Sequence, residues 1–195
     1  MYAAAAKNLM LDAIGITHVS LHTAFSTTGA NEVTGGSPAY ARKSATYAAA
    51  SGGTKASSNA PVFDVPASTT VRFIGWWTAI TAGTFLGMIA NGGTEFEFYA
   101  DLTAETIKRA AHGLVTNDKI VFTGGTPPGG LTEGTVYFVI TATTDDFQVA
   151  ATQGGAAINL TSQAGDGVVC SKIIEEVFAA QGTHTVNTQS LGLNN

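Results

Sequence analysis

His18 and His22 stand four residues apart, the spacing with which two imidazoles bind one zinc ion from a helix. The zinc-protease motif also requires a glutamate directly after the first histidine, and Val19 occupies that position. On a strand both rings would lie on one face, but the sequence suggests no third ligand nearby. We therefore expect a half-exposed polar strand face here, and no metal site.

Two glycine-containing segments have the outline of catalytic or cofactor-binding motifs. Residues 35–39, Gly-Gly-Ser-Pro-Ala, approximate a nucleophile elbow, but that elbow uses the backbone N–H after the serine, and Pro38 has none. Residues 165–167, Gly-Asp-Gly, begin like a dinucleotide fingerprint, but the third glycine and the following helix are missing. His112, next to Gly113, fits a turn histidine. The sequence thus predicts no catalytic or cofactor-binding residue.

Paired carboxylates could supply acid–base chemistry or bind calcium, and two such pairs occur: Glu95 with Glu97, and Glu175 with Glu176. The first pair alternates with phenylalanines, which is typical of a half-buried strand with a solvated face. Both pairs lie at the ends of a segment that we interpret below as an insertion, where solvated residues are expected. No cofactor and no enzymatic activity are therefore expected.

Trp76 and Trp77 are adjacent, and aromatic residues are most concentrated at this place in the sequence. Strand alternation places one indole inward and the other outward. An exposed tryptophan can be a contact hot spot for a protein or a sugar. Packing in the core or against another subunit is the interpretation that we prefer.

Charged residues make up 12% of the 195 residues, about half the average of globular proteins, whereas hydrophobic residues make up 45%. This composition excludes disorder and suits an extracellular or assembled protein. The formal net charge is −5, and the basic residues are scattered, so nucleic-acid binding is not expected. These residues are Lys7, Arg42, Lys43, Lys55, Arg72, Lys108, Arg109, Lys119 and Lys172.

The one cysteine, Cys170, excludes an internal disulfide, and its apolar neighbours predict a buried thiol. The longest apolar runs, Met1–Ala6 and Phe73–Ile80, fall far short of the roughly 18 residues of a membrane helix. No secretory signal is expected either, because Lys7 follows the alanines instead of preceding them. A protein that is built into a particle and released by lysis would need no export signal.

The sequence predicts one helix, at residues 3–14, with Gly15 placed to end it. Residues 103–111 have the propensity for a second helix, but the strands around them favour an extended segment. The remainder predicts short strands between turns, which favours an all-β sandwich or barrel. These strands are expected at residues 17–23, 40–48, 70–77, 83–89, 95–99, 119–122, 136–140, 147–150 and 167–171, with turns at residues 24–38 and 50–60.

Several stretches resemble a family of small structural proteins of tailed bacteriophages, usually labelled tail-fibre-like or minor virion proteins. The most specific of them is the loop motif Thr28–Lys43, which follows Ser20–Ala24. The resemblance continues through Asn59–Pro66 and Gly83–Gly87 and resumes at Phe178–Val186. It implies a jelly-roll-like β-sandwich. It carries no catalytic residues over to this chain.

Residues 94–174 resemble a small β module of phage fibre and baseplate proteins, with marks at Ala111–Val115, Gly134–Val139 and Phe147–Ala150. Shorter relatives run almost directly from the Gly-Thr-Phe-Leu-Gly strand into the closing strands. We therefore expect a discontinuous sandwich domain of residues 1–94 and 175–195, with a second small β domain, residues 95–174, inserted in one of its loops. Surface loops tolerate such insertions because their ends already lie close together.

The resemblance implies a non-enzymatic component of the virion, assembled in the bacterial cytoplasm and exposed on the particle as a tail fibre or tail-associated protein. The sandwich would anchor it, and the inserted domain would project. Expected partners are further copies, as a homotrimer or another symmetric oligomer, and the tail or major capsid protein. No membrane partner is expected. One alternative is a capsid decoration protein, such as a cement protein or head fibre. A second is a module that binds a host receptor or glycan through Trp76 or Trp77.

The predicted helix offers a modest apolar face, formed by Leu9, Met10, Ala13 and Ile14. We expect this helix to pack against the particle or a sister subunit, so that its deletion abolishes incorporation into particles.

Overall fold

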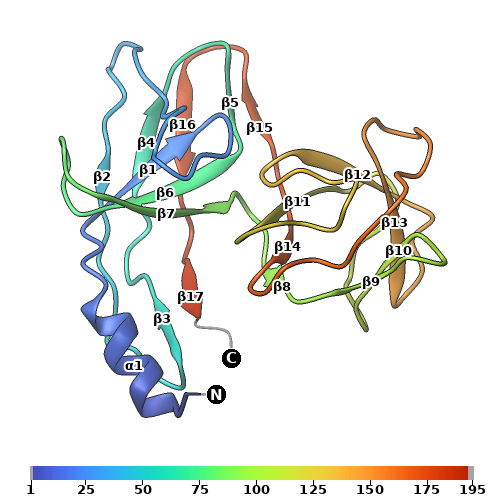
Figure 1. The fold of residues 1–195 in the computed structure, drawn as a ribbon. Coiled ribbons are helices and arrows are strands. Elements are labelled where there is room, and N and C mark those ends of the chain that lie inside the picture. Colours follow the sequence, from blue (N-terminus) through green and yellow to red (C-terminus); the bar gives the residue numbers. More distant parts are fainter. Residues whose placement is uncertain (1, 193–195) are drawn as a thin grey trace. The chain divides into compact units, whose positions relative to one another are not determined.

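The computed structural model describes residues 2–192 and confirms the all-β prediction (Figure 1). Its one helix, α1, is followed by short antiparallel strands, and no helix in residues 2–192 is long and apolar enough to span a membrane. The chain divides into two compact units. The first comprises the described residues up to Ile89 and those from Glu175 onwards, and the second is Ala90–Ile174. The second unit thus begins at Ala90, whereas the insertion was predicted to begin at Glu95. That the first part is an anchoring domain and the second an inserted one stays a prediction.

A four-stranded antiparallel sheet of order β2-β1-β6-β7 organises the first unit. Three two-stranded ladders, β15-β5, β16-β4 and β17-β3, complete it. In each ladder a strand from the end of the chain pairs with one from its first half, so the segment after the second unit belongs to the same body. The strands are β1 (His18–His22), β2 (Lys43–Ser44), β3 (Thr54–Ala56), β4 (Val62–Val65), β5 (Thr69–Val71), β6 (Phe73–Trp77), β7 (Phe85–Ala90), β15 (Glu176–Phe178), β16 (Gly182–Thr185) and β17 (Ser190–Gly192).

The core of the first unit lies between the sheet and the ladders, as in a sandwich. Val19 and Leu21 of β1 are buried on the inner face of the sheet, as their alternation predicted. They belong to one cluster with Phe63 of β4 and Phe178 of β15, each less than 10% exposed. Burial of such side chains is the main force that holds the two layers together.

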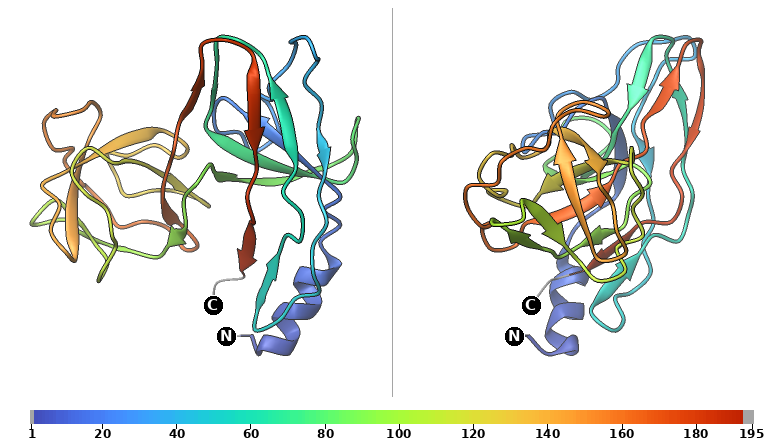
Figure 2. Two further views of the ribbon diagram at one scale, coloured as in Figure 1. Left: turned by 180° about the vertical axis from the view of Figure 1, so that it is seen from behind. Right: turned by 90° about the vertical axis from the view of Figure 1, so that its right-hand side faces the viewer.

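The second unit is one seven-stranded sheet that curls back on itself. Its order is β8-β14-β11-β12-β13-β10-β9, so the two edge strands are neighbours in sequence. Phe96 ends β8 and Tyr99 begins β9, and a chain of three residues spans at most about 11 Å. The sheet is therefore closed to within that distance, like a barrel (Figure 2). The strands are β8 (Glu95–Phe96), β9 (Tyr99–Asp101), β10 (Thr106–Lys108), β11 (Lys119–Thr123), β12 (Val136–Ile140), β13 (Asp146–Ala150) and β14 (Val169–Lys172).

The curled sheet encloses its own core. Phe122, Val139, Phe147 and Cys170 are fully buried inside it. Phe96 and Phe98 pack against this cluster, while Glu95 and Glu97 are exposed, as the alternation predicted. The segment with helical propensity is extended and contains β10, because β10 pairs with β9 and β13.

Helix α1 (Ala4–Ala13) begins and ends within one residue of its predicted limits. Leu9 is 74% and Met10 38% exposed, so the docking of this face on the particle or a sister subunit stays a prediction, while Leu11 is the side chain of the helix that packs inside the first unit. The helix is tied to the hairpin of β3, since Asn8 accepts the Gly53 N–H through its side-chain oxygen at 2.8 Å. Lys55 also donates to the Leu11 carbonyl at 3.2 Å, and this contact closes the helix end.

The local sequence pattern did not predict strands whose pairing partners lie far away in the sequence. Residues 50–60 were predicted as turns, yet β3 lies there and pairs with β17 at the end of the chain. Conversely, the strand expected at residues 40–48 is reduced to β2 and an isolated bridge at Tyr47.

Candidate functional site

The loop of residues 23–42, which contains the motif Thr28–Lys43 except for Lys43 at the start of β2, covers the outer face of β1 and β6. The Phe25 ring packs edge-on against Phe73, with centroids 5.8 Å apart. Gly29 lies so close to Trp77 that an added Cβ would meet the indole at 2.5 Å. Both faces of the sheet are therefore covered, the inner one by the core and the outer one by this loop. The contacts that hold this loop are the most elaborate polar arrangement that we find in residues 2–192.

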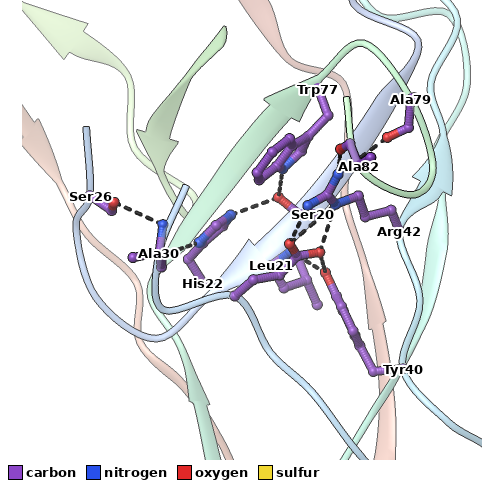
Figure 3. A network of polar contacts seen from close by, with 11 residues as sticks. Ser20, Leu21, His22, Ser26, Ala30, Tyr40, Arg42, Trp77, Ala79 and Ala82 are labelled. Atoms are coloured by element: carbon purple, nitrogen blue, oxygen red, sulfur yellow. Dashed lines mark hydrogen bonds and ion pairs between the residues drawn. The ribbon is translucent and has the colours of Figure 1, made fainter. Parts of the chain in front are cut away.

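Ser20, His22 and Trp77 form a continuous buried chain of hydrogen bonds to the loop (Figure 3). The Ala30 carbonyl can only accept, so His22 Nδ1, 2.8 Å away, carries a proton and donates it. His22 Nε2 then accepts from the Ser20 hydroxyl at 2.7 Å. That hydroxyl accepts the Trp77 indole N–H at 2.8 Å. Every polar group in this chain is satisfied when His22 is neutral.

The electrostatics agree with a neutral His22. Burial lowers the pKa of His22, because the charged imidazolium would lose its hydration. The Ala30 carbonyl and the Glu32 carboxylate raise the pKa less, and the Arg42 charge lowers it further.

A serine bonded to a histidine also forms the nucleophile–base pair of hydrolases. Here both side chains have no solvent exposure, so no substrate reaches the Ser20 hydroxyl in this structure. The group that orients His22 is a backbone carbonyl, in place of the usual carboxylate. The pair is suited to holding the loop.

The prediction of a half-exposed face through His18 and His22 was wrong, because the loop covers its second half. His18 is half-buried and its Nδ1 lies 2.8 Å from the Thr17 hydroxyl, whereas Ser20 and His22 are completely buried. In the described part of the chain, no three His, Cys, Asp or Glu side chains are grouped so that they could hold a metal ion.

Arg42 fastens the end of the loop. Its guanidinium binds the Glu32 carboxylate in a fork, with Nε–Oε1 at 2.9 Å and Nη2–Oε2 at 2.7 Å. Its Nη1 donates to the carbonyls of Ala79 and Ala82, at 3.3 and 2.9 Å, in the turn between β6 and β7. The guanidinium carbon lies 3.3 Å from the Trp77 ring centroid, a cation–π contact. One side chain thus joins the loop, the turn and the sheet.

Tyr40 replaces a missing strand partner. Beyond Val19, β1 has no pairing with β2, and the Tyr40 hydroxyl accepts the Leu21 N–H at 2.8 Å. The Tyr40 ring stacks on Phe63, with 5.8 Å between centroids. Burial raises the pKa of Tyr40 far above its usual value, so the phenol stays protonated.

Two glutamines from the last part of the chain complete the arrangement. Gln181 accepts the Ser37 N–H at 2.7 Å and donates to the Pro38 carbonyl at 2.8 Å. Gln189 accepts from the Tyr47 hydroxyl at 3.1 Å and from the Trp76 indole at 3.0 Å. Burial raises the pKa of Tyr47 to about 12, which keeps this donor protonated.

The two tryptophans point to opposite faces, as predicted, but both are engaged. Trp76 is half-buried and packs against the core cluster of the first unit, while Trp77 is 7% exposed beneath Arg42 and Phe85. Trp77 therefore offers no free face to a sugar, and the glycan-binding alternative loses one of its two platforms.

The other sequence candidates are dispersed. The Ser37 backbone N–H is held by Gln181, and Nδ1 of His112 accepts the Leu114 N–H at 3.0 Å within a turn. Glu175 pairs with Arg72, and Glu176 with Nδ1 of His184, each at 2.5 Å. Residues 165–167 form a turn with no helix after it. These groups do not converge on one site.

Cys170 is fully buried in β14, as predicted. Burial raises the pKa of its thiol well above the usual value.

Sequence reasoning missed the buried hydrogen-bond chain around His22. A signal was present, since Ser20 and His22 share one strand face, but their burial depends on a loop whose path the alternation does not encode.

In a comparison with known families, residues 8–93 match the family model described as podophage GP4 fiber I protein gp80. Comparisons with curated proteins and with solved structures gave no match. The matched segment contains α1 from Asn8 onwards, strands β1 to β7 and the whole loop of residues 23–42 with Ser20, His22 and Trp77. The match confirms the resemblance to the fibre-type structural proteins of tailed-phage virions.

Proposed function

We propose that this chain is a non-enzymatic component of a surface appendage of a tailed phage, anchored through its first unit and projecting its second. The observation that carries the proposal is the match of residues 8–93 to a phage fibre protein family. All of the matched residues up to Ile89 belong to the first unit. The shared part is therefore the natural candidate for the contact with other virion proteins.

The buried network supports a structural role for the loop. Ser20 and His22 are inaccessible to solvent. The Arg42 guanidinium is fully engaged, because it pairs with Glu32, donates to two backbone carbonyls and stacks on an indole. Such satisfied buried networks rigidify a protein and fix one conformation. A rigid loop that covers a sheet suits a particle component, which must keep its shape outside the cell.

The ends of the second unit support its role as a projecting module. The Ile174 N–H donates to the Asn91 carbonyl at 2.8 Å, and the Asn91 side chain donates to the Ile174 carbonyl at 2.9 Å. The two ends of the insertion thus lie side by side, so a short link can replace it.

The first experiment is cryo-electron microscopy of the virion with the complete chain and with residues 92–173 replaced by two glycines. Density on the tail or its tip supports the tail appendage, and density on the head shell supports the decoration alternative. The shortened chain should still be incorporated, with only the projecting density lost. If it folds but fails to assemble, the first unit is not the anchor.

The exposed residues of α1 give a sharper test of its docking than a deletion. Removing residues 1–14 would also remove the buried Leu11 and unsettle the first unit. Leu9→Ser changes only the 74% exposed side chain and should keep the fold while reducing incorporation into particles. Ala5→Ser, also exposed on α1, is the control. Normal incorporation of Leu9→Ser would remove the docking role from this helix.

A further inference from the structure

Strand β7 is the longest strand in residues 2–192, with six residues, and it lies at an edge of the four-stranded sheet (Figure 1). It is hydrogen-bonded to β6 on one side and, within the described chain, to no strand on the other. Long edge strands present a row of unpaired N–H and C=O groups that can accept a strand from another chain.

The other edges are protected by devices that natural proteins use against such pairing. At the opposite edge, β2 has only two residues, and its Lys43 approaches Asp64 at 3.7 Å. The three ladders of the first unit are at most four residues long, and the sheet of the second unit is curled almost closed. Short length, charge and closure are all ways of blunting an edge, and β7 has none of them.

Most side chains of β7 pack within the first unit, so the backbone N–H and C=O groups at its edge are the groups available to a partner. Ile89 packs against the core cluster on the inner face. On the outer face Phe85 packs against Trp77, and the sulfur of the 9% exposed Met88 accepts the Ser26 N–H at 3.3 Å. Leu86 is 38% exposed and is the most accessible large side chain of the strand. A partner at this edge would therefore be held by main-chain hydrogen bonds, as in strand addition.

We propose that β7 pairs with β7 of a second copy of this chain, antiparallel across a two-fold axis. Residues 73–94 contain no Asp, Glu, Lys, Arg or His, so two copies meet there without like charges in spite of the net charge of −5. A neutral, apolar edge is complementary to another neutral, apolar strand, and β7 itself is such a strand. Antiparallel pairing about a two-fold axis is isologous: each residue makes the same contact in both copies and the assembly closes.

The test is sedimentation velocity of the full chain over a range of concentrations. The wild-type chain should show a monomer–dimer equilibrium. When residues 85–90 of two copies pair antiparallel, Leu86 lies opposite Ile89 of the second copy, so Leu86→Lys sets a cation against an apolar side chain and should weaken dimerisation about tenfold or more. Val177→Lys is the matched control: it makes the same change at a 69% exposed site on β15 and should leave the dimer unchanged.

A charge of the opposite sign tests the same position. Leu86→Glu alone should also be monomeric, because its carboxylate then lies against Ile89 of the second copy. Hydrogen exchange locates the contact, since amides of residues 85–90 should become more protected as concentration rises.

Three outcomes overturn the proposal: a monomer at every concentration, a trimer or larger ring, or a dimer that Leu86→Lys does not weaken. A chain that is monomeric alone but protected at residues 85–90 in the virion assigns the edge to another virion protein and also overturns it. The test does not depend on whether the chain belongs to tail or head.

Discussion

Gly75 is the position at which the smallest possible change should do most damage to the polar network. A Cβ at this residue would lie 2.5 Å from Nε2 of His22 and 2.6 Å from the Ser20 hydroxyl oxygen. Both side chains are completely buried between the sheet and the loop, so neither can move aside into solvent. Gly75→Ala must therefore separate the two groups or displace the strand.

The cost follows from the contacts that are lost. Overpacking of a close-packed interior costs about 1–3 kcal/mol. Separating Ser20 from His22 leaves a buried donor or acceptor unsatisfied, which costs a further 1–3 kcal/mol or so. We therefore expect Gly75→Ala to lower the free energy of unfolding of the first unit by about 4 kcal/mol.

The assay is urea unfolding followed by tryptophan fluorescence. The chain has two tryptophans, both on β6, so the signal reports the first unit alone. Gly15→Ala is the control, because its added Cβ meets no atom within 4 Å and its backbone is not left-handed. It should change stability by no more than about 0.5 kcal/mol. If Gly75→Ala costs less than about 1 kcal/mol, Ser20 and His22 are not packed against β6 as described here.

Three further predictions concern other groups. Arg42→Lys should cost the first unit about 2–3 kcal/mol and shift the tryptophan emission to the red, because lysine cannot reproduce the fork to Glu32 or the stacking on Trp77; unchanged emission would contradict this. Because burial lowers the pKa of His22, the unfolded chain binds a proton below about pH 6.5 that the native unit does not, so acidification should lower stability by up to about 1.4 kcal/mol per pH unit. The urea midpoint of unfolding should change less with pH in His22→Gln than in the wild-type chain. Equal changes in both would mean that other titrating groups cause the loss of stability. The Cys170 thiol should react with a disulfide reagent only as fast as the second unit opens, since it is fully buried and its pKa is raised; rapid labelling of the native chain would show that β14 is accessible.

The sequence by itself determined the fold class, the helix and most long strands. Val19 and Leu21 alternate with polar residues, and residues 136–140 form a strand with the limits predicted. Both predictions rest on local sequence patterns, which can be recognised without knowing which strands pair with them. The resemblance to phage fibre proteins was readable as well, because the loop motif is a contiguous run of residues.

Only the tertiary structure decided what happens to polar residues and to short strands. Ser20 and His22 look solvated in the sequence, yet the loop of residues 23–42 buries them, and the burial of Leu11 of the helix was not predicted. The strands β3 and β4 depend on partners more than 100 residues away, in β17 and β16. Burial and long-range pairing depend on which surfaces meet in space, and local periodicity does not contain that information.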